Sequence, residues 1–278
     1  MSGLHSIAQN LRVLEVVVPA PWFFTSSGSE HLDLLGRLVR KSCSLRKLGI
    51  HAAGRIYAWS RFRDGATKNA FQTVRDFGWL FNHTDSAARK QLNLQALRLT
   101  NFCLCRADEN CIRSMRDLLR WRALRSAHFT CPVFIQIAAE QDVQLRSLSL
   151  HFDNPDDGVR SCVDDPDIDQ LRVFLASQKE LQELEIYNEG QVFDPLDDDT
   201  EDSMGLFESL GNSLYELVVH HNESEDIPGR TRPLLSQTVL QHMGEKFQHL
   251  TRLAIDLPPE DDMVCMRNHA LRASMQHS

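Results

Sequence analysis

Four cysteines have a spacing that could support metal chemistry. Cys103, Cys105 and Cys111 form a C-x-C-x5-C pattern, and Cys131 follows in the next segment. Zinc sites use cysteine pairs with the spacing C-x2–4-C, which is missing here. We therefore predict structural thiols, with no metal and no cofactor. The seven cysteines also lack the framework of a secreted domain, so we expect reduced thiols in the cytoplasm or nucleus.

Clustered carboxylates are a second feature that could support chemistry. They lie in three Asp-rich segments, at 153–158, 164–169 and 194–202. None has the glycine and terminal glutamate of a calcium-binding EF-hand loop, so we interpret them as solvated loops. The chain also lacks G-x-S-x-G, H-E-x-x-H and Walker motifs, and the prediction is therefore a protein that is not an enzyme.

Charge is distributed unevenly along the chain. Residues 1–140 carry 20 Lys and Arg against 10 Asp and Glu, whereas residues 141–278 carry 10 against 28. The halves therefore have net charges of +10 and −18, which together give the formal net charge of −8. A partner of matching polarity or head-to-tail self-contact would explain this asymmetry. The simplest interpretation is that the Asp-rich loops happen to lie in the second half.

Nucleic acid and membrane are not the predicted partners. The arginines of the basic segment 106–125 alternate with the apolar positions of an expected helix, and no RNA- or DNA-binding motif is present. The N-terminus lacks the features of a secretory signal, and no run approaches the roughly 20 apolar residues of a membrane span. An intracellular protein is expected.

The elements that would position a binding site come from a repeated pattern, L-x-x-L-x-L. Its seven copies are "LRVLEV" at 11–16, "LRKLGI" at 45–50, "LQALRL" at 94–99, "LRSLSL" at 145–150, "LQELEI" at 181–186, "LYELVV" at 214–219 and "LTRLAI" at 250–255. A weaker copy, "WRALRS" at 121–126, fits only at its first and fourth positions. The last two apolar residues of each copy share one face of a short strand, which becomes buried when strands stack on one another.

The segments between the copies have the apolar spacing of helices. We expect helices over 29–42, 110–119, 165–178 and 232–247, the first with Ser29 as its N-cap. Strand and helix in regular alternation predict an α/β solenoid. Its parallel strands would form the concave face and its helices the convex face.

This pattern resembles the leucine-rich repeats of ribonuclease-inhibitor-like proteins. Its irregular spacing is most similar to the repeats of divergent, fungal-type F-box proteins. The resemblance implies one irregular leucine-rich-repeat solenoid of about seven to eight repeats over 1–260, followed by a tail or cap at 261–278. The chain departs from the family pattern in three ways: most steps between copies are longer than the usual repeat of about 20–29 residues, the Asn that usually follows each strand is missing from most copies, and no F-box is present.

The resemblance implies a non-catalytic module for protein–protein recognition. One specific form is the substrate-binding part of an F-box-type ubiquitin-ligase receptor, in which ligase components would bind through an F-box outside this chain. An F-box-independent scaffold or inhibitor is the alternative. A GTPase-activating or other enzyme-regulating repeat protein is an alternative of another class, and no catalytic residue supports it.

The repeat register predicts which side chains face a partner, because positions 3, 5 and 7 of each copy point away from the core. The candidate binding residues are Lys47, His51, Arg98, His151, Glu183, Glu185, Tyr187, Glu216 and His220. This face would change from basic to acidic along its length and would suit a basic peptide or a protein surface bearing Arg or Lys. The alternative is an exposed strand face that is simply polar.

The three histidines of this face are not expected to bind zinc. His51 and His151 would lie three strands apart if the weak copy forms a strand, a separation of roughly 14 Å. Zinc needs ligand nitrogens at about 2.1 Å.

Overall fold

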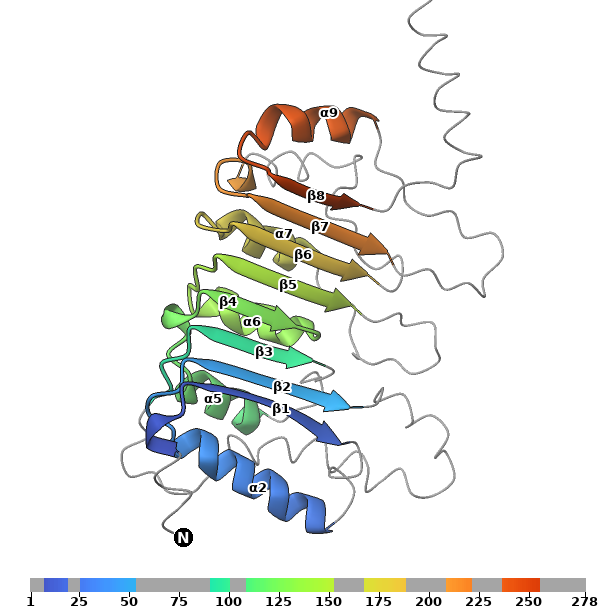
Figure 1. Cartoon of the computed structure of the whole chain (residues 1–278). Helices are drawn as coiled ribbons and strands as arrows, with labels where there is room; N and C mark the ends of the chain where they lie inside the picture. The colour runs from blue at the N-terminus through green and yellow to red at the C-terminus, as the bar shows by residue number, and fades with distance from the viewer. Residues whose placement is uncertain are drawn as a thin grey trace, which may run out of the picture.

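A single open sheet of eight parallel strands dominates the computed structural model, which describes residues 8–19, 26–53, 91–100, 109–152, 168–188, 209–221 and 237–255. The strands lie side by side in chain order (Figure 1). They are β1 (Val13–Pro19), β2 (Lys47–Ala53), β3 (Ala96–Thr100), β4 (Ser126–Phe129), β5 (Ser147–Phe152), β6 (Glu183–Asn188), β7 (Glu216–His221) and β8 (Arg252–Ile255). The predicted α/β class with parallel strands is confirmed.

The predicted register is confirmed for the seven strong copies. Position 3 of each copy aligns with position 3 of its neighbour, as in the pairs Val13 with Lys47 and Ser147 with Glu183. Positions 1, 4 and 6 are buried in most copies, and Leu145, Leu148 and Leu150 are at most 1% exposed. The leucine spacing therefore places one face of the inner strands in the core, whereas Leu253 on the outermost strand β8 is 44% exposed.

The position of the weak copy was predicted wrongly by three residues. Ser126 aligns with Ala96 and Ser147, so the repeat begins at Leu124 and not at Trp121. Trp121–Ala123 forms a 3-10 turn (η3) whose buried tryptophan precedes the strand. The true copy, "LRSAHF", places Ala127 and Phe129 where leucine is expected, and the prediction missed it for that reason.

Helices follow the strands and lie behind the sheet in the view of Figure 1, as α5, α6 and α7 show. The described helices are α2 (Ser26–Lys41), α5 (Glu109–Leu118), α6 (Pro132–Glu140), α7 (Ile168–Ser177) and α9 (Gln237–Lys246). The four predicted helices correspond to α2, α5, α7 and α9. Ser29 was wrongly predicted as an N-cap, because α2 already begins at Ser26 and the preceding Ser-Ser-Gly run continues the helix.

Helix α6 was not predicted. It buries Phe134, Ile135, Ile137 and Ala138, so its apolar residues are not confined to one stripe. The 3.6-residue period that reveals an amphipathic helix is therefore weak here.

The core lies between the sheet and the helices. It joins the buried strand leucines to helix residues including Leu32, Val39, Met115, Leu175 and Met243 in one continuous cluster. In the part of the chain that the structure describes, no helix combines the length and apolar character needed to cross a bilayer. The predicted tail or cap at 261–278 and the Asp-rich segments at 153–158 and 194–202 lie outside the described residues.

Candidate functional site

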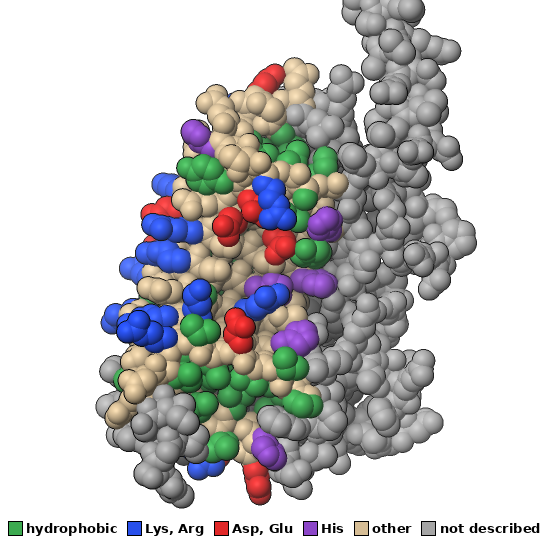
Figure 2. All heavy atoms as spheres, in the orientation of Figure 1, with side chains coloured by type: hydrophobic (Ala, Val, Ile, Leu, Met, Phe, Trp, Pro, Cys, Tyr) green, Lys and Arg blue, Asp and Glu red, His purple; other side chains and the backbone are tan. Residues whose placement is uncertain are grey.

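The sheet face opposite the helices, here called the open face, points toward the viewer in Figures 1 and 2. Positions 3, 5 and 7 of the repeats form three rows across it, as the register predicted. All nine candidate residues lie in these rows: Lys47, His51, Arg98, His151, Glu183, Glu185, Tyr187, Glu216 and His220.

Three rings from neighbouring strands form a continuous aromatic row on the open face. Tyr187 on β6 lies between His151 on β5 and His220 on β7. The ring centroids are 5.7 Å apart for His151 and Tyr187 and 5.2 Å apart for Tyr187 and His220. Both separations are in the range of favourable aromatic contacts. The aromatic row thus presents partly exposed rings near the carboxyl ends of the strands.

Carboxylates border the aromatic row. Glu183 and Glu185 lie on β6, and neither forms an ion pair with Lys or Arg within the described ranges. Glu216 differs, because Arg252 of β8 donates a hydrogen bond to its carboxylate at 2.6 Å. Two carboxylates without an ion pair therefore precede Tyr187 on β6, Glu185 roughly 7 Å and Glu183 roughly 13 Å away along the strand, and the sequence had suggested three.

Tyr187 itself stays neutral at physiological pH. Burial raises the pKa of its phenol, and the hydrogen bond and negative charge of Glu185 raise it further, while Arg252 acts weakly in the opposite direction. A neutral phenol keeps an O–H donor and an electron-rich ring, which is the face that attracts cations.

The basic candidates form a separate group. His51 and Lys47 lie on β2 and Arg98 on β3, and His51 is three strands from His151. The side chain of Glu15 on β1 packs over Gly49, the residue between Lys47 and His51 on β2. A Cβ atom added to Gly49 would lie 3.1 Å from the Glu15 Cγ, which shows how close this contact is. The structure therefore does not bring all nine residues together, and the acidic and aromatic group on β5–β7 is the more coherent site.

His128 belongs to the open face but was missed in the sequence. It occupies position 5 of the misaligned repeat, between Arg98 and Ser149. Its Nδ1 is hydrogen-bonded to the Ser149 Oγ at 2.8 Å, and its buried Nε2 has no hydrogen-bond partner among the described residues. Correct alignment at Leu124 would have revealed it.

The surroundings of His128 keep its imidazole neutral. Burial is the main cause that lowers its pKa from 6.5 to about 4, and the charges of Arg98, His151 and His51 lower it further against the opposing effect of Glu185. Protonation would require N–H donors on both nitrogens, and the one on Nε2 would be buried without an acceptor.

Stability is expected to fall as the pH drops from about 6.5 to 4. In that window the unfolded chain binds a proton at His128 that the folded chain does not. The shift, reduced for partial exposure, corresponds to about 2 kcal/mol. Urea unfolding of the wild type and of His128→Gln at pH 7 and pH 4.5 measures this.

The variant should lose less stability than the wild type over this range, because glutamine does not titrate. Carboxylates titrate in both proteins, so the difference between the two profiles isolates His128. Equal losses in the two proteins would contradict the assignment.

Metal binding gains no support from the geometry. Among the described residues, no group of three His, Cys, Asp or Glu side chains is arranged to hold a metal ion. Cys131 is a buried cysteine at the start of α6, whereas the side chains of Cys103, Cys105 and Cys111 lie outside the described residues.

The fold and the site together define an α/β protein with one layer of helices, an open parallel sheet and an exposed strand face that carries an aromatic row. Comparison with protein-family models gives no match, and comparisons with curated proteins and with solved structures give none either.

Proposed function

We propose that the chain is a leucine-rich-repeat solenoid that acts as a non-catalytic protein-recognition module. The proposed ligand is a lysine or arginine side chain on a basic peptide or protein surface. The observation that supports this most strongly is the aromatic row of His151, Tyr187 and His220 beside Glu183 and Glu185. The sequential parallel sheet and its leucine spacing support the repeat architecture.

The aromatic row and its carboxylates complement a cation in two ways. A guanidinium or ammonium over the neutral Tyr187 ring gains a cation–π interaction. The carboxylate of Glu185, two residues before Tyr187 on β6, can accept a charge-assisted hydrogen bond from the same group. Glu183 lies roughly 13 Å from Tyr187 along the strand and adds a longer-range attraction for a basic partner. Arginine fits best, because its planar fork can stack on a ring and donate in its plane at once.

The neighbouring groups do not oppose a cation. His128, two strands from Glu185, is neutral at pH 7 and adds no positive charge there. Arg252 is already engaged by Glu216 one strand away. In Figure 2 acidic side chains lie on the upper half of the open face with a basic side chain among them, and the lower half also carries an acidic side chain.

Reversing the charge beside the aromatic row should abolish recognition of a basic partner. We expect Glu183→Lys/Glu185→Lys to lower the affinity for such a partner by at least about 100-fold, since two attractive charges become repulsive. An affinity purification from cells with the wild-type chain identifies partners, and titration of the purified partner measures the loss.

A matched control changes two exposed glutamates on helices, Glu30→Lys/Glu245→Lys, which alters net charge equally. Binding should survive in this variant. Equal loss in both variants would point to overall charge, and retained binding in both would place the recognition surface elsewhere. Tyr187→Ala tests the ring separately and should weaken binding while leaving the carboxylates in place.

The F-box resemblance gives a specific form of this proposal, a substrate receptor of a ubiquitin ligase. Its test is the recovery of ligase subunits with the chain in the same purification. Recovery of a stable partner without ligase subunits would favour a scaffold or inhibitor instead.

A further inference from the structure

Arginine recurs at position 2 of the repeats, a position outside the three rows of the open face. Arg12, Arg46, Arg125 and Arg146 occupy it before β1, β2, β4 and β5, and Gln95 occupies it before β3. We call these four residues the arginine row. Figure 2 shows Lys and Arg side chains along the edge of the face where the strands begin.

Main-chain bonds hold the arginine row in line. The Arg12 carbonyl accepts hydrogen bonds from the N–H groups of Arg46 and Lys47, and the Arg46 carbonyl accepts from Gln95 and Ala96. The same pattern continues through Gln95 and Arg125 to Arg146. Neighbouring strands are about 4.8 Å apart, so the four strand steps from Arg12 to Arg146 span roughly 19 Å.

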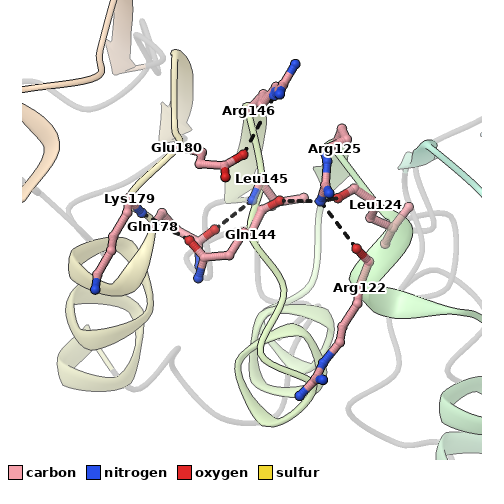
Figure 3. Close-up of polar contacts among 9 residues, drawn as sticks. All are labelled: Arg122, Leu124, Arg125, Gln144, Leu145, Arg146, Gln178, Lys179 and Glu180. Carbon is pink, nitrogen blue, oxygen red and sulfur yellow. Dashed lines mark hydrogen bonds and ion pairs between the residues drawn. The ribbon is translucent and has the colours of Figure 1, made fainter.

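Two of the guanidiniums are held in equivalent positions by carbonyls. Arg46 Nη1 donates to the Leu45 oxygen at 3.4 Å and to the Asn93 oxygen at 3.3 Å, just before the next repeat begins. Arg125 Nη1 makes the corresponding contacts with Leu124 at 3.0 Å and Gln144 at 3.2 Å (Figure 3).

These contacts leave donors of both guanidiniums available, since each has five N–H groups and the bonds involve one nitrogen. A side chain that is already ordered loses less conformational entropy when a ligand binds.

The charge of the arginine row is largely uncompensated. Arg146 has a loose contact with Glu180, 3.8 Å between Nε and Oε2, and both side chains are more than half exposed. In the described part of the chain, no carboxylate lies within ion-pair distance of Arg12, Arg46 or Arg125. Carbonyls satisfy hydrogen bonds without neutralising the positive charge.

We propose that the arginine row binds an acidic peptide segment of a partner protein, independently of the open face. A roughly six-residue extended segment spans 19 Å, and its carboxylates can accept paired hydrogen bonds from the free guanidinium donors. Single-stranded nucleic acid fits less well, because base stacking needs aromatic rings and none stands at position 2 between Arg12 and Arg146.

The test uses a fluorescein-labelled peptide of about eight residues that alternates Glu and Gly, long enough to span the row. Its anisotropy is measured against the wild-type chain and Arg46→Gln/Arg125→Gln. We expect binding by the wild type that weakens by about tenfold or more in the variant, since two charged donors are lost. Glutamine keeps an N–H donor for the carbonyls, and thermal melting verifies that the fold is intact.

The matched control is Arg37→Gln/Arg113→Gln, which removes the same charge from exposed sites on α2 and α5 and should bind like the wild type. Equal weakening in both variants, or no peptide binding by the wild type, overturns the proposal. A single-stranded oligonucleotide that binds more tightly than the peptide overturns the choice of an acidic protein partner. Glu183→Lys/Glu185→Lys should still bind the acidic peptide, so the two surfaces are tested separately.

Discussion

Leu148→Asp is expected to abolish cooperative unfolding of the chain. Leu148 on β5 is 1% exposed and lies in the core between Ala127 on β4 and Leu184 on β6. The substitution removes the apolar contacts of leucine and places a carboxylate among apolar side chains without a partner. The expected loss exceeds about 5 kcal/mol, which is comparable with the whole stability of an ordinary domain.

The position of Leu148 within the sheet makes the loss global. β5 has three parallel strands beyond it on one side and four on the other, so its failure separates the two halves of the sheet. In a stacked array each repeat is stabilised mainly by its immediate neighbours. Circular dichroism during heating, together with proteolysis at low temperature, should show an unfolded or partly folded chain.

His151→Asp is the control for the face assignment. His151 lies three residues further along the same strand, but its side chain is on the open face. The variant should unfold cooperatively with a loss of less than about 1 kcal/mol. Loss of cooperativity in both variants, or in neither, would contradict the assignment of faces.

The sheet could be predicted from the sequence because its period is carried by leucine itself. Apolar residues, mostly leucine, recur at positions 1, 4 and 6 and are buried in five of the seven copies, which identifies both the strands and their inward face. The repeat beginning at Leu124 broke this pattern with Ala127 and Phe129, and the apolar helix α6 follows it directly. His128 was missed for the same reason, since its place on the open face depends on that register.

The sequence predicts which row of the open face each site residue occupies, but not which side chains form ion pairs with one another. The aromatic row follows from the register of β5, β6 and β7. The ion pair between Glu216 and Arg252 depends on side-chain conformations that spacing does not determine. The arginine row was overlooked because position 2 was not considered, although the dipeptide Leu-Arg begins four of the eight aligned copies.

A buried glutamine links the repeats of β5 and β6, and its loss is expected to destabilise the fold by about 3 kcal/mol. Gln178 is 1% exposed and lies between α7 and β6. Its Oε1 accepts a hydrogen bond from the Leu145 N–H at 2.9 Å, and its Nε2 donates to the Val143 oxygen at 3.0 Å (Figure 3 shows the Leu145 contact). Gln178→Leu keeps a similar volume but leaves both backbone groups buried and unpaired.

Gln182→Leu is the matched control, because Gln182 is an exposed glutamine four residues later and its described bonds involve only the main chain. Urea unfolding should show a change below about 0.5 kcal/mol for this variant. Gln178 provides its buried amide bonds from the residue directly after α7, where it joins two neighbouring repeats. Similar stability in the two variants would mean that the Gln178 amide contributes no net stabilisation and that packing alone holds these repeats together.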